Sequence, residues 1–232
     1  MGKRGKRYRE GADLVDRMKL YDLAEGVQLL KRSASAKFEE TVDLAVHLGV
    51  DPRHADQNIR GTVSLPHGTG QEIRVAVFAQ GDKAREAEEA GADAVGTDDL
   101  VDKIVDGWLE FDATIATPDL MRTIMPKLGR ILGPRGLMPN AKTGTVTMDV
   151  AETIRTIKAG QIEYRVEKES GVIHAPVGKA SFEENQIKEN IEAVMGALVR
   201  ARPSSIKGRY LRTIAVSSTM GVGIRLEPAQ FS

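Results

Sequence analysis

Residues 41–50 alternate between apolar side chains and polar or small ones. This period of two is typical of a β-strand with one buried face. A second such strand is predicted over residues 59–65, and before both strands the spacing of Asp22 and Glu25 predicts the start of an amphipathic helix. The glycine-bearing residues 66–70 then predict a linker.

The middle of the chain has a different pattern. Residues 73–79 form a nearly continuous apolar run, typical of a strand buried on both faces of a parallel sheet. Strands and helices then alternate up to Gly160, which indicates a small doubly wound α/β domain. The predicted helices lie at residues 83–90, at 100–108, from Thr117 onward and from Asp149 onward, and the further strands lie near 94–95 and at 113–116.

After this domain the half-buried pattern returns. Residues 161–168 and 172–177 predict a β-hairpin around a Glu-Ser-Gly turn. Ser181 and Glu184 have the spacing of a helix cap, and the apolar periodicity that follows predicts a long helix that Pro203 ends.

A last strand is predicted over residues 211–216. The half-buried strands at the two ends of the chain indicate one α+β sheet, so the α/β segment is an insertion. We therefore predict α/β plus α+β in two domains. Residues 1–66 with 160–232 form a discontinuous α+β domain, and residues 67–159 form an inserted, Rossmann-like, three-layer domain.

Composition narrows the class of protein. The 232 residues are 41% hydrophobic and 28% charged, as in soluble globular proteins. The absence of cysteine excludes disulfides, thiolate zinc sites and cysteine nucleophiles, and fits a reducing compartment. No apolar run approaches the ~20 residues of a membrane span, and the basic residues 1–10 do not resemble a secretory signal. We expect a cytoplasmic protein without a membrane partner.

The charges are unevenly distributed although the net charge is zero. Residues 80–119 carry twelve acidic side chains against three basic ones, a local balance of −9. Residues 120–148 carry five basic side chains and no acidic one, and residues 1–10 and 200–212 are also basic. Basic clusters of this kind can contact phosphate, and each can equally be an ordinary solvated face.

No constellation for catalysis is present in the sequence. The predicted first βα turn of the inserted domain has the single glycine Gly81, and neither phosphate-binding glycine motif occurs. Acidic pairs such as Asp98-Asp99 fit a solvated helix face. We expect no enzyme, cofactor or metal, because the histidines lack metal-ligand spacing: His47, His54, His67 and His174.

Three stretches have a composition that suits contact with RNA. Met125–Asn140 is basic and rich in glycine and proline, which predicts an ordered, packed loop or a basic contact surface. In Ser35–Thr41 a cation and Phe38 precede a strand, and this aromatic ring either caps the core or stacks on a base. Val216–Gly223 offers hydroxyls and glycine amides to sugars and phosphates, or is a polar turn.

With these stretches together, the chain resembles the bacterial-type family of the large-subunit ribosomal protein "L-one", which forms the mobile stalk beside the tRNA exit site. Residues 51–68, His174–Phe182 and Ser218–Gly221 support the resemblance. The most specific part is the signature loop, with Gly133, Pro134, Arg135, Gly136 and Pro139.

The resemblance implies a split terminal domain and a Rossmann-like inserted domain. It also implies a ribosomal monomer without a cofactor that binds large-subunit rRNA, assists release of deacylated exit-site tRNA and represses translation by binding its own operon's mRNA. A free mRNA-binding regulator and a nucleotide-dependent enzyme are the alternatives. The implied rRNA contacts are Lys37, Phe38, Thr41, His174, Lys179, Ser217, Thr219, Met220 and Gly221.

Overall fold

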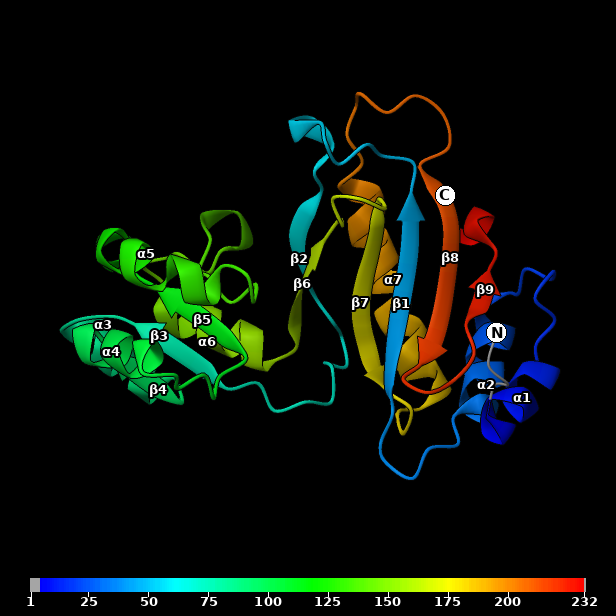
Figure 1. The fold of residues 1–232 in the computed structure, drawn as a ribbon, viewed down its shortest axis with the longest axis horizontal. Coiled ribbons are helices and arrows are strands. Elements are labelled where there is room, and N and C mark those ends of the chain that lie inside the picture. The colour runs from blue at the N-terminus through cyan, green and yellow to red at the C-terminus, as the bar shows by residue number, and fades with distance from the viewer. Residues whose placement is uncertain (1–4, 232) are drawn as a thin grey trace. The chain divides into compact units, whose positions relative to one another are not determined.

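The computed structural model describes residues 5–231, which form two compact units (Figure 1). The terminal unit contains the residues up to Gly70 and those from Ile162 onward, and the inserted unit is Gln71–Gln161. Each unit has hydrophobic clusters of its own. The predicted fold class is confirmed. Of the predicted basic N-terminal segment, Lys3 and Arg4 lie outside the described residues.

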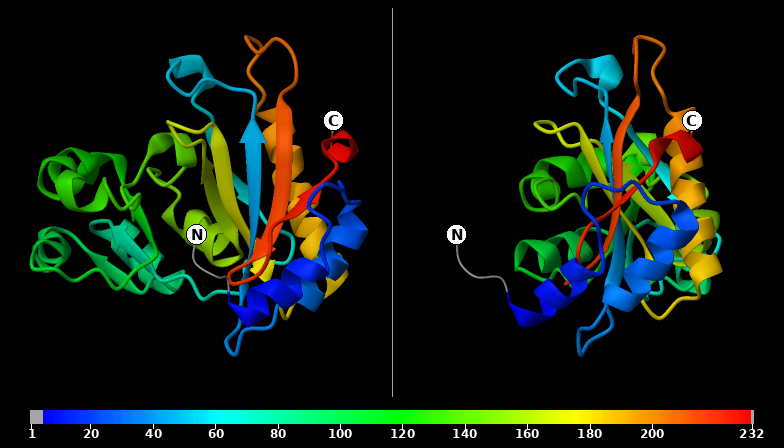
Figure 2. Two further views of the ribbon diagram at one scale, coloured as in Figure 1. Left: turned by 45° about the vertical axis from the view of Figure 1, so that its right-hand side comes forward. Right: turned by 90° about the vertical axis from the view of Figure 1, so that its right-hand side faces the viewer.

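The terminal unit is built on a four-stranded antiparallel sheet with the order β7-β1-β8-β9. Side chains along β1 alternate between buried and half-buried, as the period of two predicts. The buried side chains pack against helices α2 and α7, which lie on the same side of the sheet (Figure 2). The bounds are α2 Leu23–Ser33, β1 Thr41–Leu48, β7 Val172–Lys179, α7 Glu184–Arg200, β8 Leu211–Ser218 and β9 Ile224–Leu226.

The predicted single sheet and the predicted hairpin are both wrong. Strand β6 (Gln161–Arg165) pairs with β2 (Arg60–Ser64) in a separate two-stranded sheet, whereas β7 pairs with β1. The tight turn between β6 and β7 does form, with Gly171 N donating to Glu167 O. Ile162 and Tyr164 of β6 are buried in the same core as Ile173 and Ala175 of β7, so the burial pattern that predicts the two strands does not specify how they pair.

The sequence did not predict helix α1 (Lys6–Asp13) or strand β9, which are short or bury few apolar residues. Helix α1 buries only Gly11, and β9 has three residues, too few for a detectable period. Helix α7 begins two residues later than Ser181 suggests. Its capping box joins Glu183 and Gln186, and Ser181 instead donates a hydrogen bond to the carboxylate of Glu39. Short 3-10 turns lie at Ala55–Gln57, Ala141–Thr143 and Pro228–Phe231.

The inserted unit has the predicted doubly wound form. Its parallel sheet has the order β4-β3-β5, and all four residues of β3 are buried. Alternate residues of β3 contribute to two different clusters, one with α4 and α5 and the other with α3 and α6, which makes three layers. The bounds are β3 Val75–Phe78, α3 Asp82–Glu89, β4 Ala94–Gly96, α4 Asp98–Val105, β5 Ala113–Ala116, α5 Pro118–Leu132 and α6 Val150–Lys158.

The first half of the stretch expected as a packed loop is helical. Helix α5 continues to Leu132 despite Pro126, which has no N–H for the helical ladder. Ile124, Leu128 and Leu132 recur at every fourth residue and are at most 2% exposed, so burial of this face outweighs the missing hydrogen bond. Only Gly133–Asn140 forms a loop.

Asn190 of α7 ties three parts of the terminal unit together. The side chain is fully buried, and its Nδ2 donates to Val177 O at 2.8 Å and to Gly68 O at 3.0 Å. Its Oδ1 accepts a hydrogen bond from His67 N at 3.1 Å. The segment that leaves the terminal unit is thus fixed to α7 and β7.

We expect Asn190→Ala to lower the free energy of unfolding of the terminal unit by about 2–4 kcal/mol, because several buried backbone groups lose their partners. Asn185→Ala is the matched control, since Asn185 lies on the same helix and is exposed. Denaturant unfolding followed by circular dichroism measures both. Equal stability of the two variants would contradict the anchoring role.

Candidate RNA-binding site

One end of the four-stranded sheet brings distant segments together. The antiparallel register places Thr41, at the start of β1, opposite Lys179 at the end of β7. On the other side, Val42 lies opposite Ser218 at the end of β8. The segments that precede β1 and follow β8 therefore meet at this end of the sheet.

Glu40 is the buried centre of this end of the sheet. Its residue is 3% exposed, and its Oε2 accepts hydrogen bonds from Ser218 Oγ at 2.7 Å and from Met220 N at 2.9 Å. Its Oε1 accepts from Ala36 N at 2.8 Å. Burial alone would raise the pKa of Glu40, but these hydrogen bonds favour the carboxylate and hold the pKa below its ordinary value. The sequence carried no signal for this role.

Thr41 and Thr219 join the same two segments by two hydrogen bonds, one between backbones and one to the Thr219 hydroxyl. Thr219 N donates to Thr41 O at 3.0 Å, and Thr41 N donates to Thr219 Oγ1 at 2.9 Å. Lys179 Nζ donates to Thr41 Oγ1 at 3.0 Å, and the residue is only 9% exposed. Lys179 therefore fixes the Thr41 hydroxyl, and little of its own side chain is exposed to a partner.

Two apolar side chains project outward from this frame. Phe38 is 55% exposed and Met220 is 48% exposed, so Phe38 does not cap the core. Lys37 and Thr219 are exposed beside them in sequence. Gly221 closes the turn by donating to Ser218 O, and a Cβ there would lie 2.4 Å from Ser218 Oγ, so a side chain at this position would displace the hydroxyl that binds Glu40.

The remaining predicted contacts lie on the sheet face away from the helices. Ser217 is half-buried and lies opposite Asp43, while His174 is exposed and lies opposite Ala45, further along the sheet. Burial raises the pKa of the Asp43 carboxyl, and the positive charges of His174 and Lys179 oppose that shift. Among the predicted contacts, His174 therefore lies away from the Ser218–Gly221 turn, further along the sheet.

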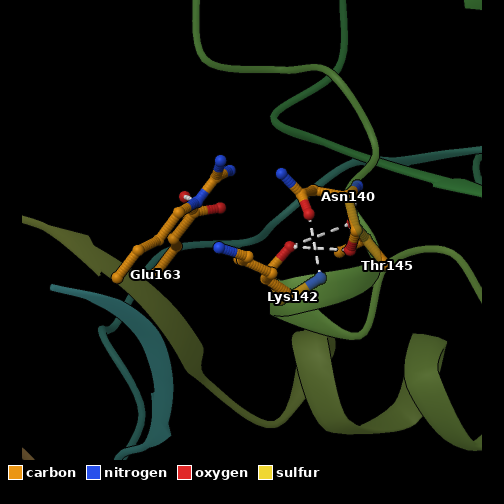
Figure 3. Close-up of polar contacts among 6 residues, drawn as sticks. Asn140, Lys142, Thr145 and Glu163 are labelled. Carbon is orange, nitrogen blue, oxygen red and sulfur yellow. Dashed lines mark hydrogen bonds and ion pairs between the residues drawn. The ribbon is translucent and has the colours of Figure 1, made fainter. Parts of the chain in front are cut away.

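The signature loop belongs to the inserted unit. Gly133, Pro134, Arg135 and Gly136 are exposed, whereas Pro139 is buried. The loop ends at Asn140, whose side chain accepts from Lys142 N at 2.8 Å and whose N–H donates to Thr145 Oγ1 at 2.8 Å (Figure 3). This network gives the exposed part of the loop a fixed end.

Other kinds of site have no structural counterpart in the described part of the chain. Between residues 5 and 231, no three His, Asp or Glu side chains gather closely enough to hold a metal ion. Within the same range, no helix is long and apolar enough to cross a membrane.

We expect Glu40→Gln to destabilise the protein by about 1–3 kcal/mol at pH 7, because buried hydrogen bonds to the carboxylate are weakened. The pKa of Glu40 lies below its ordinary 4.5 in the folded state, so its contribution is present above that value. The contribution disappears as the pH falls through the folded pKa. The stability gap between wild type and variant should therefore narrow below about pH 4.5.

Denaturant unfolding of both proteins between pH 7 and pH 3 measures this gap. Glu10→Gln serves as the control, since Glu10 is an exposed glutamate of the same unit. A gap that stays constant over this pH range would show that Glu40 is not stabilised as a carboxylate.

The model of the family described as "Ribosomal protein L1p/L10e family" matches residues 30–222. This range includes both segments of the sheet end and the whole signature loop. It covers well over half of the chain. Proteins of this family are structural and not enzymatic. The chain belongs to the ribosomal protein L1p/L10e family and is a large-subunit ribosomal protein that binds rRNA.

Proposed function

We propose that the end of the terminal sheet, with Phe38 and Met220 at its surface, binds the stalk region of large-subunit rRNA. The observation that carries the proposal is the exposure of two large apolar side chains on segments that Glu40 holds together. Exposed apolar groups beside cations and hydroxyls suit RNA, whose unstacked bases pack on such platforms.

Each exposed side chain of the sheet end contacts the part of the RNA that suits its chemistry. Phe38 and Met220 contact bases, and Lys37 neutralises a phosphate. The hydroxyls of Thr219 and Ser217 bond to ribose or phosphate. Because the frame is already hydrogen bonded without RNA, little ordering is needed on binding, and this favours affinity.

The other predicted residues act around this centre. Lys179 and Thr41 position Thr219 through their hydrogen bonds, and Gly221 allows the turn to close. His174 extends the contact along the sheet face.

We also propose the finer roles that the family resemblance implies. The protein is of the bacterial type and works as a monomer on cytoplasmic ribosomes. There it helps deacylated tRNA leave the exit site, and it represses its own operon when the same surface binds the mRNA. The exposed signature-loop residues, among them Arg135, are a further contact surface of the inserted unit.

We expect Thr219→Ala and Met220→Ala each to weaken binding of stalk rRNA by about 1–3 kcal/mol, from a lost hydrogen bond or apolar contact. Met148→Ala is the matched control, because Met148 is 50% exposed, close to Met220 at 48%, and lies in the inserted unit. Filter binding or calorimetry gives the dissociation constants. Wild-type affinity of both site variants would show that the site lies elsewhere.

We expect a chain in which a short Gly-Ser linker replaces Gln71–Gln161 to keep its affinity for stalk rRNA within about tenfold, roughly 1.4 kcal/mol. The reason is that the terminal unit has its own core and contains every proposed contact of the sheet end. Circular dichroism checks that this chain is folded. Complete loss of binding by the folded chain would contradict the proposal.

A further inference from the structure

Helix α1 packs directly beside the proposed RNA surface. Gly11 is buried, and a Cβ built on it would lie 3.5 Å from Val222 Cγ2 and 3.7 Å from Ser33 Cβ. Val222 follows the Gly221 turn, and Ser33 ends the helix that leads to Lys37. The helix thus touches both segments that carry the surface. It lies outside residues 30–222, so the family match does not account for it.

The two arginines of α1 point in different directions. Arg7 precedes Gly11 by four residues, so it lies on the same side of the helix as the contact with Val222. Arg9 is about 200° from Arg7 around the helix axis at 3.6 residues per turn. Both side chains are exposed, and neither forms an ion pair within residues 5–231.

Arg7 is close enough to the site to act on its central carboxylate. Burial raises the pKa of Glu40, hydrogen bonds from Met220, Ala36 and Ser218 lower it, and the positive charge of Arg7 lowers it further. Glu40 is 3% exposed and its oxygens already accept three hydrogen bonds. Among residues 5–231 Arg7 has no ion-pair partner, so its guanidinium donors are available to another anion.

We propose that Arg7 is a further RNA contact, whose guanidinium binds a backbone phosphate of the RNA that covers Phe38 and Met220. The inference rests on the proposed function of that surface. Phosphate is the ligand that fits, because an arginine fork binds two phosphate oxygens at once and the neighbouring groups suit bases and riboses.

The surface beyond α1 continues this character. A shallow hollow lies between α1 and the segment after Gly221, and its charged lining residues are Arg17, Arg225 and Asp16. Arg17 Nη2 donates to Tyr8 OH at 3.2 Å, which holds this cation against α1. The hollow thus has two basic residues and one acidic residue in its lining, next to the segment that follows Gly221.

The test compares Arg7→Gln with Arg9→Gln in the full chain, with a transcribed fragment of large-subunit rRNA that contains the stalk. The two variants remove the same charge from the same helix, so they differ only in the side from which it is removed. We expect Arg7→Gln to weaken binding roughly tenfold or more and Arg9→Gln to bind like the wild type. Arg7→Gln should also reduce the slope of log affinity against log salt by about 0.7–0.9, the loss of one phosphate contact.

Arg7→Lys keeps the charge without the planar fork, so it should bind more weakly than wild type with an unchanged salt slope. Wild-type affinity of Arg7→Gln would overturn the inference, and so would an equal loss in both glutamine variants. A loss in Arg7→Gln without a change in salt slope would show that Arg7 acts only through Glu40, which also overturns it. Failure of the wild type itself to bind the fragment would instead overturn the proposed function, and Arg7's role with it.

Discussion

A carboxylate that loses contact with water is strongly destabilised unless hydrogen bonds replace its hydration. Glu40 meets this condition by accepting from a hydroxyl and from two backbone amides. These donors lie on segments on either side of the chain's insertion, and Ser218 is 178 positions after Glu40. Satisfying one buried charge therefore fixes the relative position of both segments.

This constraint explains why the candidate surface can be both exposed and ordered. Phe38 and Met220 would gain free energy by burial, yet the backbone on either side of them is held by Glu40 and by the pairing of Thr41 with Thr219. The result is a rigid frame with apolar side chains facing outward. Monomeric proteins seldom expose such groups together without a partner, and the family's partner is rRNA.

The inserted unit accounts for the neutral charge of the chain as a whole. Its acidic segment of residues 80–119 forms the helices α3 and α4, where part of the charge is paired. Asp98 accepts a hydrogen bond from Lys127 at 2.8 Å and Glu86 from Lys83 at 2.7 Å. Arg7 and the sheet end lie in the other unit. An overall charge near zero is thus compatible with RNA binding, because the charges are segregated between the units.

The features that the sequence predicted are those that depend on residues close together in the chain. The period of two in residues 41–50 and the apolar run of residues 73–79 predicted strands with the right burial, since these patterns depend only on which face meets a core. The alternation of strands and helices likewise indicated the inserted α/β unit. The sequence also singled out Phe38 and Thr219 as candidates, through local composition and the family resemblance.

Only the tertiary structure decided which strands pair, that Phe38 faces outward and that Glu40 is buried. A turn follows β6, yet β6 pairs with β2, a strand about 100 residues earlier in the chain, which the local pattern of apolar residues does not specify. The pattern around Glu40 is that of an ordinary exposed acid. Its hydrogen-bond donors come from chain segments that only the folded sheet brings near, so the local sequence could not reveal its role.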